Sequence, residues 1–366
     1  MLRGSPPGSS ADKSDGQKGL LPLMKAVLLS KDLPAYKANL HCHTIYSDGK
    51  LTPAEVKERY QAKGYSIVAY SDHNVLVDHA ELNGPDFLAL PAIEMDVYRS
   101  DPVFAFRPCY HVNFFPRRSG QTAIPCFNPD HIRHGNLQEE LRARQAHIGG
   151  SDYVRVYENV QEIIDAYRDA GFLAMINHPT WSLQTAADYR DLHGFFAIEL
   201  YNNGSAVKDG YYEFNTAIWD ELLMSGMRIF GTATDDNHNQ KPFGDPKDDS
   251  CGGFTVIQAD SLTQEAVTDA LGAGRFYAST GPLFRSIVLQ DDILKVECSP
   301  VRKVLLTTGH RQASVVRPAS GMETVTSAEF DLHHILSDSY VRLTLVDAKG
   351  RFAWSQPIYN YIGRKE

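Results

Sequence analysis

Short apolar runs alternate with amphipathic helical patterns through the middle of the chain, and this alternation limits the possible folds more than any other feature. The runs cover residues 67–70, 87–93, 103–115, 172–176, 195–200 and 228–233. Each run is too short, or too interrupted by turn residues, to be a long helix, so each is a predicted strand. Strands that alternate with helices build β/α units around a parallel sheet or barrel. The sequence therefore predicts an α/β fold.

The ends of the chain and one internal segment depart from this pattern. Residues 1–18 are rich in Ser, Gly, Pro, Asp and Lys, a composition that buries too little apolar surface to offset its ordering entropy, so we predict a disordered tail. Residues 117–150 are polar and irregular and are predicted to be an insertion, often a lid. Beyond residue 284 the pattern changes to strict alternation. We therefore divide the 366 residues into the tail, a barrel at 19–283 and a small C-terminal β-sandwich-like domain at 284–366.

The net charge and the cysteines narrow the classes of partner and compartment. A net charge of -9 and a pI near 5.9 argue against a nucleic-acid surface, so a small-molecule substrate is favoured. The five cysteines are scattered without a Cys-x-x-Cys pair, which favours a reducing, cytoplasmic setting. No stretch is long enough to span a membrane. The oligomeric state stays open, a homo-oligomer included.

Side chains that can bind metal ions stand at the ends of the predicted strands. His41 and His43 are two residues apart, so on a strand both project from one face, while Cys42 faces the other way. In a β/α barrel the C-terminal strand ends converge on one face, which brings residues distant in the sequence within reach of shared ions. The candidate ligands are His41, His43, Asp48, His73, Glu94, His111, His178, Asp236 and His238.

This donor set predicts a catalytic metal site. Nitrogen and oxygen donors without thiolate suit zinc, manganese or iron, and they do not choose among the three. At about three or four protein ligands per ion, the set implies two or three divalent ions with open positions for water. A single histidine at a strand end is more often structural, so the prediction depends on the whole set. Histidines of the insertion and the β domain are predicted to be solvated or structural, namely His131, His134, His147, His333 and His334.

The motifs that carry these ligands resemble the PHP superfamily, the polymerase-and-histidinol-phosphatase metallohydrolases, over about residues 37–282. The matching pieces are HCH at 41–43, SDG at 47–49, SDHN at 71–74, IE at 93–94, His111, NHP at 177–179 and DNH at 236–238. The resemblance implies a distorted, TIM-like (β/α)7 barrel that holds a trinuclear site. Residues 274–282, together with the β domain, resemble a branch that includes carbamate-pesticide (carbaryl) hydrolases.

The resemblance also implies how the ligands are shared among the ions. The three implied sets are His41, His43, Glu94 and Asp236 for one ion, Glu94, His111 and His178 for a second, and Asp48, His73 and His238 for a third. Asp235 competes with Asp236 for its place, and we prefer Asp236 because its spacing to His238 matches the motif.

The favoured function is a metal-dependent hydrolase, and more specifically a phosphoesterase of small phosphorylated molecules. A hydroxide that bridges two ions would attack phosphorus, with Glu94, Asp236 and His238 as the catalytic residues. The first alternative is an amide, carbamate or ester hydrolase on the same trinuclear site. The second is a non-catalytic metal-binding module, which the open ligand set disfavours because structural zinc sites are closed by four protein ligands.

Residues around the ligands bear on the choice of substrate. Several arginines in the pocket would favour phosphate, but Arg117, Arg118 and Arg275 are each more simply explained as solvated surface residues. A dry aromatic pocket would favour an apolar carbonyl substrate, and its candidate members are Trp181, Tyr201 and Phe243. Glu199 stands where a partner of a ligating histidine would lie, and a purely structural role explains it equally well.

Overall fold

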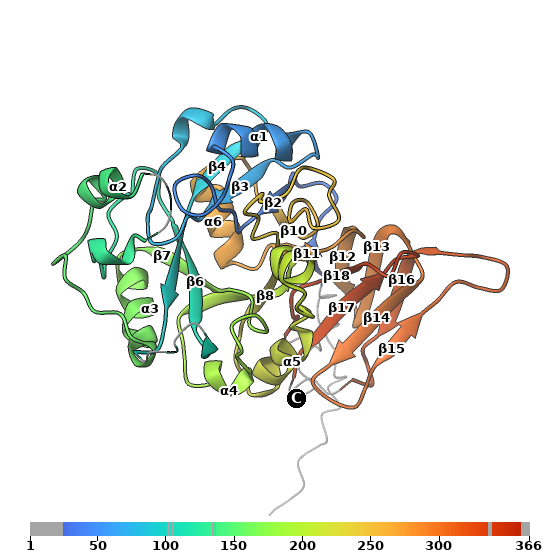
Figure 1. Cartoon of the computed structure of the whole chain (residues 1–366). Coiled ribbons are helices and arrows are strands. Elements are labelled where there is room, and N and C mark those ends of the chain that lie inside the picture. Colours follow the sequence, from blue (N-terminus) through green and yellow to red (C-terminus); the bar gives the residue numbers. More distant parts are fainter. Residues whose placement is uncertain are drawn as a thin grey trace, which may run out of the picture.

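The structure is a computed structural model that describes residues 25–100, 103, 106–133, 135, 137–335 and 339–359. It has a mixed α/β architecture in which a helix-covered part lies beside a part built from sheets (Figure 1). The tail predicted for residues 1–18 and the predicted solvated residue His134 both lie outside the described residues. None of the described helices has the length and apolar character that crossing a bilayer requires.

The first helix shows how local sequence sets an element. Thr52 caps it: its hydroxyl accepts from the Glu55 backbone N–H, and the Glu55 carboxylate accepts from the Thr52 N–H at 2.8 Å. Pro53 occupies the first position, where its missing N–H removes no bond. The helix buries Val56 and Tyr60 against the sheet beneath. The helices are α1 (Pro53–Gln61), α2 (Gln138–Arg144), α3 (Val160–Asp169), α4 (Ala186–Tyr189), α5 (Thr216–Met224) and α6 (Gln264–Gly272).

The strands of the helix-covered part fall into two sheets. In the first, the order β11-β10-β2-β3-β4 joins β2 (Ala35–Asn39), β3 (Ile67–Tyr70), β4 (Leu88–Pro91), β10 (Phe254–Gln258) and β11 (Phe276–Ser279). In the second, the order β5-β6-β7-β8-β9 joins β5 (Ile93–Val97), β6 (Tyr110–Pro116), β7 (Phe172–Ile176), β8 (Phe195–Asn202) and β9 (Phe230–Thr234). The runs β2-β3-β4 and β7-β8-β9 are parallel, so within each run the strands end on one side.

The strand predicted at 103–115 is shorter than expected. The strand found there, β6, begins only at Tyr110, and the described residues of this run before Tyr110 form no strand. Pro108 stands two residues ahead and has no N–H to donate to a ladder. The other strand predictions of the barrel region fall on strands of the structure.

The two sheets meet at two seams, and each seam is a single bridge between residues. Cys42 bridges Asn237 beyond the ends of β2 and β9, and His73 bridges Glu94 between the end of β3 and β5. Asn74 and Asp236, one beside each bridge, have φ angles of 63° and 51°, a left-handed conformation that cannot continue a ladder. The described pairing therefore gives two sheets joined by isolated bridges at both seams, and the distorted seven-stranded barrel stays a prediction.

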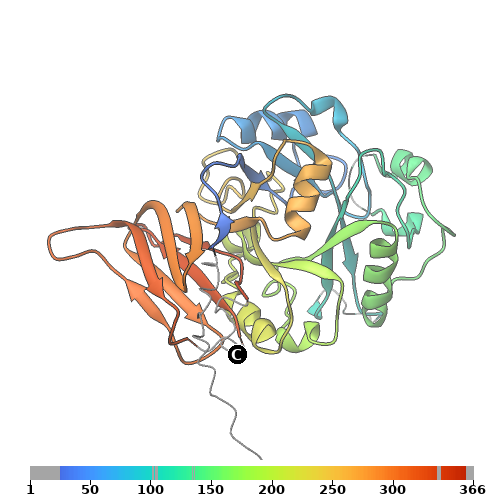
Figure 2. The same cartoon turned by 180° about the vertical axis from the view of Figure 1, so that it is seen from behind.

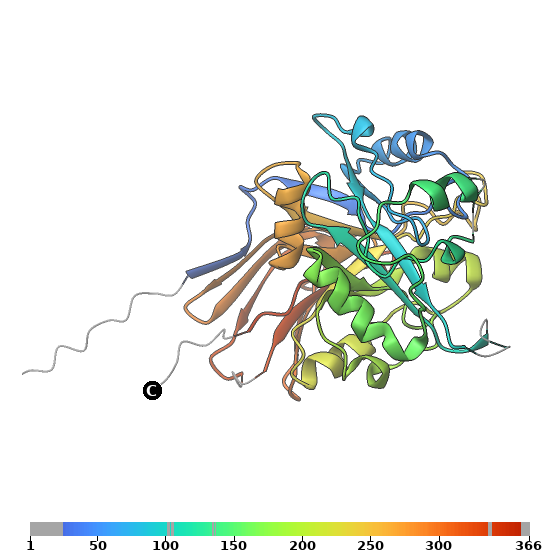
Figure 3. The same ribbon diagram turned by 90° about the vertical axis from the view of Figure 1, so that its left-hand side faces the viewer.

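The C-terminal strands extend one of these sheets and add another. Strands β14 (Lys303–Thr308), β15 (Ser314–Val316), β17 (Val341–Val346) and β18 (Phe352–Trp354) join the first sheet through β18 and β11. Strands β12 (Phe284–Gln290), β13 (Ile293–Val301) and β16 (Val325–Asp331) form a separate sheet, whose edge is the N-terminal strand β1 (Lys25–Leu29) (Figures 2 and 3). The alternation that the sequence predicts beyond residue 284 holds in β13 and β14, whereas β17 is buried at five of its six positions. The division into domains stays a prediction.

The segment predicted as an insertion is largely irregular. Within residues 117–150 the described chain forms the short helical turn η3 (Pro129–His131) and the helix α2, which lie on the outer side of the helix-covered part (Figure 1). Further short turns are η1 (Ala80–Leu82), η4 (Tyr157–Asn159) and the π-helical turn η5 (Ser205–Asp209).

Candidate metal centre

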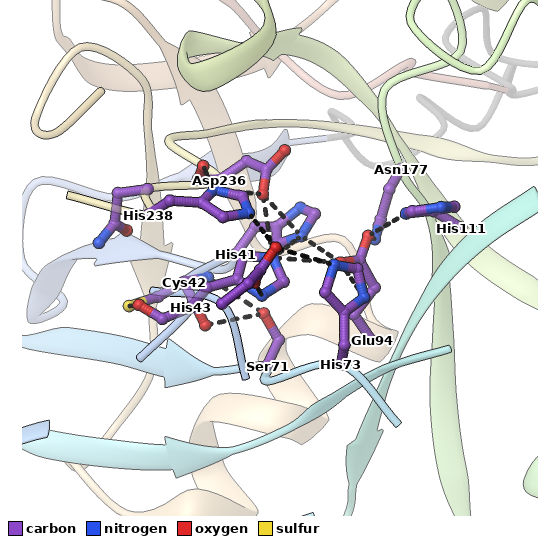
Figure 4. Close-up of polar contacts among 12 residues, drawn as sticks. His41, Cys42, His43, Ser71, His73, Glu94, His111, Asn177, Asp236 and His238 are labelled. Atoms are coloured by element: carbon purple, nitrogen blue, oxygen red, sulfur yellow. Dashed lines mark hydrogen bonds and ion pairs between the residues drawn. The ribbon is translucent and has the colours of Figure 1, made fainter. Parts of the chain in front are cut away.

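The nine candidate ligands lie together at the seams between the two sheets, and Figure 4 shows most of them. Each comes from a strand or from the loop that follows it. His41, His43 and Asp48 follow β2, His73 follows β3, Glu94 lies in β5, His111 lies in β6, His178 follows β7, and Asp236 and His238 follow β9. The convergence expected of strand ends accounts for the ligands that follow β2, β3, β7 and β9, which are almost two hundred positions apart. Glu94 and His111 instead lie near the beginning of β5 and of β6, which is antiparallel to its neighbours.

The ligand atoms form three donor groups, each with its atoms within 4.8 Å of one another. We name the groups by their position. The buried group is His41, His43, Glu94 and Asp236, the outer group is His43, Asp48, His73 and His238, and the side group is His73, Glu94 and His111. Every pair of groups shares one residue, either His43, Glu94 or His73. The groups are therefore adjoining parts of one site.

These groups differ in two places from those that the family resemblance implies. The buried group has the implied members, and the outer group gains His43. In the side group His73 stands where the resemblance places His178. The His178 Nε2 nevertheless lies 3.3 Å from the Glu94 Oε1, at the edge of that group. Which ions these residues hold stays a prediction.

Hydrogen bonds turn the histidine rings so that one nitrogen of each faces the cluster. The Nδ1 of His41 lies 2.9 Å from the Glu199 carboxylate, and that of His178 lies 3.1 Å from the Ser182 hydroxyl. The Nδ1 of His238 lies 3.0 Å from the Asp236 carbonyl. A partner on Nδ1 that accepts a proton leaves the Nε2 lone pair for a metal ion. The site is therefore oriented for ligation through Nε2 at these three rings.

The cluster concentrates carboxylates and imidazoles where water is excluded. Burial opposes charge on the Glu94 and Asp236 carboxyls, but the surrounding histidines hold both pKa values well below the usual range. Burial likewise disfavours a charged His43, yet the adjacent Asp236 and Glu94 carboxylates raise its pKa to about 10. Without metal, protons on histidines balance the buried carboxylates. Divalent cations can replace those protons, since metal binding requires neutral imidazoles and ionised carboxylates.

The donor set fits divalent metal ions. The Oδ1 of Asp236 is buried and makes no hydrogen bond, although it lies 3.0 Å from the His43 Nε2 and 3.2 Å from the His41 Nε2. A buried carboxylate oxygen without a hydrogen bond, beside two imidazole nitrogens that lie 3.2 Å from each other, is placed to share a cation with them. All donors are nitrogen or oxygen, which suits zinc, manganese or iron.

Asp235 and Asp236, between which the sequence left a choice, face different ways. The Asp235 carboxylate accepts the backbone N–H groups of Cys251, Gly252 and Gly253 at 2.7–2.8 Å and the Tyr60 hydroxyl at 2.8 Å. Burial raises the pKa of Asp235 to about 7, although these hydrogen bonds act the other way. Asp235 therefore closes the 251–253 loop, while Asp236 faces the donor groups.

Glu199 holds two of the histidines in place. One carboxylate oxygen accepts from the His41 Nδ1 and the Thr234 hydroxyl, and the other accepts from the His178 backbone N–H and the Asn202 amide. The side chain is fully buried and all four distances are between 2.6 and 2.9 Å. Of the two roles that the sequence left open, these contacts support that of a partner for the ligating histidines.

Replacing Glu199 with glutamine is expected to weaken metal binding by about 10–100-fold, the range found when such partners of ligands are removed. Each oxygen of Glu199 accepts two hydrogen bonds, whereas glutamine has one oxygen and one NH2 group. In either orientation the NH2 group would face two hydrogen-bond donors, and both of those bonds would be lost. Calorimetric titration with Mn²⁺ measures the change. Glu213→Gln is the matched control, because Glu213 is also a buried glutamate but bonds Thr180, Trp181 and Asn215, none of them a ligand. Equal effects of the two substitutions would contradict the role of Glu199.

Three residues beside the ligands were not assigned roles from the sequence. The Tyr98 hydroxyl lies 3.2 Å from the His111 Nε2, and the Lys208 ammonium lies 3.4 Å from the His238 Nδ1. The Asn177 amide donates to the Glu94 Oε1 at 2.7 Å. Asn177 precedes a candidate ligand and could have been suspected on that ground. Tyr98 and Lys208 stand in no motif, so only the fold reveals them.

A cavity of about 400 Å³ adjoins the side group. Its wall includes Trp181, whose ring packs edge-on against His111 and His178, with centroids 5.1 and 4.8 Å apart. Of the three aromatic residues suggested for such a pocket, only Trp181 lines it. Tyr201 hydrogen-bonds Asn203, and Phe243 packs under Arg59. The remaining lining residues are Tyr98, Phe106, Arg107, Cys109, Leu183 and Tyr211.

No family model matches the chain. A stretch of 48 residues is 42% identical to a 5'-3' exoribonuclease of Haemophilus influenzae, and the match covers 13% of this chain and 18% of that enzyme. The chain thus spans less than a fifth of the length of the curated relative it matches.

Three solved structures resemble the chain. A two-domain Bacteroides vulgatus protein, named as containing a predicted PHP-like metal-dependent phosphoesterase, is 11% identical with a TM-score of 0.42, covering 89% of this chain and 96% of its own. A Bifidobacterium adolescentis protein named for a metal-dependent phosphoesterase is 17% identical, with a TM-score of 0.34 and coverages of 58% and 92%. An amidohydrolase from Chromobacterium violaceum is 18% identical, with a TM-score of 0.34 and coverages of 55% and 87%. At such low similarity we derive the function from the site.

Proposed function

We propose that the protein is a metal-dependent hydrolase of the PHP type that acts on a small-molecule substrate, with a phosphoester as the favoured substrate. The observation that carries this proposal is the sharing of His43, Glu94 and His73 among three adjoining donor groups. A structural metal site is closed by four protein ligands around one ion, whereas shared ligands suit neighbouring ions with open positions. This arrangement also speaks against a module that only stores metal.

The buried and the partly exposed residues of the site have different roles in the proposed reaction. When bound, divalent ions would acidify a water molecule and stabilise negative charge on the substrate. His41, His43 and Glu94 are almost fully buried and keep the inner part of the site rigid and dry. The Asp48 side chain is 34% exposed, and Asp48 and His238 therefore face the side from which a substrate can arrive. The Lys208 ammonium beside His238 can bind an anionic oxygen there, which favours a phosphate group.

The cavity next to the side group supports a second candidate function. Its wall is mostly aromatic and aliphatic, with Arg107 as the one guanidinium among the lining residues. By the criterion drawn from the sequence, such a pocket favours an apolar carbonyl substrate, that is, an ester, amide or carbamate. The resemblance of residues 274–282 to carbamate hydrolases points the same way and stays a proposal, as does the seven-stranded barrel.

Hydrolysis of a matched chromogenic panel tests the function and separates its two forms. The Mn²⁺-loaded protein is given 4-nitrophenyl phosphate, bis(4-nitrophenyl) phosphate, 4-nitrophenyl acetate and a 4-nitrophenyl carbamate, with His41→Ala as the blank. We expect the highest kcat/KM on a phosphate ester. Preference for the acetate or the carbamate would show that the enzyme is a carbonyl-substrate hydrolase and not a phosphoesterase. If the metal-saturated protein hydrolysed none of the four substrates, the hydrolase proposal would be rejected.

Metal removal gives a further expected result. Dialysis against a chelator should reduce hydrolysis of the preferred substrate to the level of His41→Ala, and added Mn²⁺ should restore it, because the ions supply the nucleophile and the charge stabilisation. Circular dichroism before and after chelation establishes that the fold persists. Full activity in a sample shown to be free of metal would contradict the proposed site.

A further inference from the structure

Arg155 links the segment predicted as an insertion to a loop of the metal centre. Its guanidinium is buried, with the side chain 5% exposed. It donates to the Asn74 side-chain oxygen at 2.6 Å and to the His131 Nδ1 at 2.7 Å. The Asn74 amide in turn donates to the His131 carbonyl at 3.0 Å. Arg155 and His131 thus hold the side chain of Asn74, the residue that follows His73, in place through hydrogen bonds.

Asn74 controls the position of His73. Its backbone is left-handed, with φ at 63°, and its N–H donates to the Glu94 carbonyl at 2.8 Å. The bridge between His73 and Glu94 lies directly beside it. A left-handed residue other than glycine needs outside contacts to hold it, since the conformation costs about 1–3 kcal/mol. The grip on the Asn74 side chain supplies such contacts.

Arg155 also reaches the strand that carries Glu94. Asp96 lies two residues beyond Glu94 in β5, and its carboxylate is 3.7 Å from the Arg155 guanidinium. Asp96 also pairs across the sheet with His111. The cation of Arg155 therefore balances a buried carboxylate on the strand pair that holds two members of the side group.

A second set of contacts ties the same segment to the site. Gln145 accepts the Leu76 backbone N–H at 2.8 Å, on the loop that follows His73. Gly135 packs so closely on the carbonyls of Tyr46 and Ser47 that a Cβ there would lie 2.7 Å from both oxygens. These contacts flank the outer group on the sides of His73 and Asp48. They fix this segment against the loops of the metal centre, whereas a lid has to move away from the site to admit substrate.

From these contacts we infer that the described part of the predicted insertion, together with Arg155 just beyond it, is a clamp that positions His73 for metal binding, with Arg155 as its main positioning residue. The inference rests on the proposed metal site. His73 belongs to the outer and side groups and is absent from the buried group. Loosening the clamp therefore weakens the ions of the outer and side groups and spares the ion of the buried group.

Metal binding by Arg155→Lys and Asn74→Gly tests the inference without using activity. Lysine keeps the charge of Arg155 but loses the fork that reaches three partners, and glycine keeps the left-handed backbone of Asn74 but loses its side chain. Calorimetric titration with Mn²⁺, with metal content after dialysis at fixed free Mn²⁺, is expected to show about 10–100-fold weaker binding of the ions beyond the first. The tightest ion should bind as in the wild type.

The matched control is Arg144→Lys, in the same segment, because Arg144 is exposed and pairs only with Glu140 among the partners described. Unchanged affinities in both clamp variants would overturn the inference, and so would equal weakening of every ion. If Arg155→Lys failed to fold, Asn74→Gly would decide. A wild type that binds ions as expected but hydrolyses nothing would remove the proposed function and leave the clamp standing.

Discussion

Glu94→Gln is expected to lower kcat/KM by about three orders of magnitude and to remove most of the stabilisation by metal ions. The Glu94 carboxylate is the only candidate ligand that approaches five imidazoles, with one oxygen 3.1–3.2 Å from three of them and the other 3.0–3.3 Å from two. Those rings belong to His41, His43, His73, His111 and His178. Loss of the ions removes several kcal/mol of transition-state stabilisation, and each 1.36 kcal/mol is tenfold in rate.

Thermal unfolding separates this loss from a general loss of stability. At a Mn²⁺ concentration a hundred times its Kd, the wild type should gain about 2.7 kcal/mol of stability. We expect most of that gain to be lost in Glu94→Gln, because the buried and side groups share this residue and the glutamine amide offers one neutral oxygen in place of two charged ones. Glu213→Gln should keep both the gain and the activity. A Glu94→Gln protein that retained either would show that the shared ligand lies elsewhere.

The convergence of most ligands could be predicted from the sequence because it follows from strand ends, with His111, near the beginning of the antiparallel strand β6, as the exception. His41 and His43 follow one apolar run, and Glu94 closes another. Parallel strands carry such residues to one edge whatever the details of the packing. The preference for Asp236 over Asp235 also agrees with the structure, where Asp235 binds the 251–253 loop. These predictions required only chain order and motif spacing.

The seams and the neighbours of the ligands depend on contacts between distant residues, so the local pattern could not reveal them. Nothing near Arg155 in the sequence signals that it reaches Asn74, which is 81 positions away. Likewise the pairing of β1 with β12 joins Lys25 to Gln290, far apart in the sequence, and a periodicity window does not detect it. The family resemblance implies a distorted barrel but not where its pairing is interrupted, and in the structure the left-handed residues Asn74 and Asp236 lie beside the two seams.

Backbone strain and function coincide at the cluster. His178 and Asp236, both candidate ligands, have left-handed φ angles of 25° and 51°, and Asn74 beside His73 has 63°. Each such residue costs about 1–3 kcal/mol and persists only where surrounding contacts fix it. Here Glu199 accepts the His178 N–H, Asn202 donates to the Asp236 carboxylate, and the clamp holds Asn74. The same contacts that aim the ligands therefore also offset the strain.

Trp219→Ala is expected to lower the free energy of unfolding by about 3–5 kcal/mol, the usual cost of removing a fully buried tryptophan. Trp219 lies in α5, is fully buried, and donates its indole N–H to the Ile229 carbonyl at 3.0 Å, next to β9. On its other side the Arg342 guanidinium lies 5.2 Å from the ring, and Arg342 pairs with Asp220 through two hydrogen bonds. The residue thus joins α5, β9 and the C-terminal strand β17.

Urea unfolding of the metal-saturated protein, followed by circular dichroism, measures this cost as a shift in midpoint at constant slope. Trp219→Phe should cost less, about 1–3 kcal/mol, since it keeps an aromatic ring and loses mainly the bond to the Ile229 carbonyl. Trp181→Ala makes the same truncation at a partly exposed cavity wall and should cost less than Trp219→Ala. If all three variants had the same urea midpoint, the proposed role of Trp219 in joining α5 to the C-terminal strands would be wrong. Two separate transitions in Trp219→Ala alone would instead mean that this one side chain makes the two regions unfold as a unit.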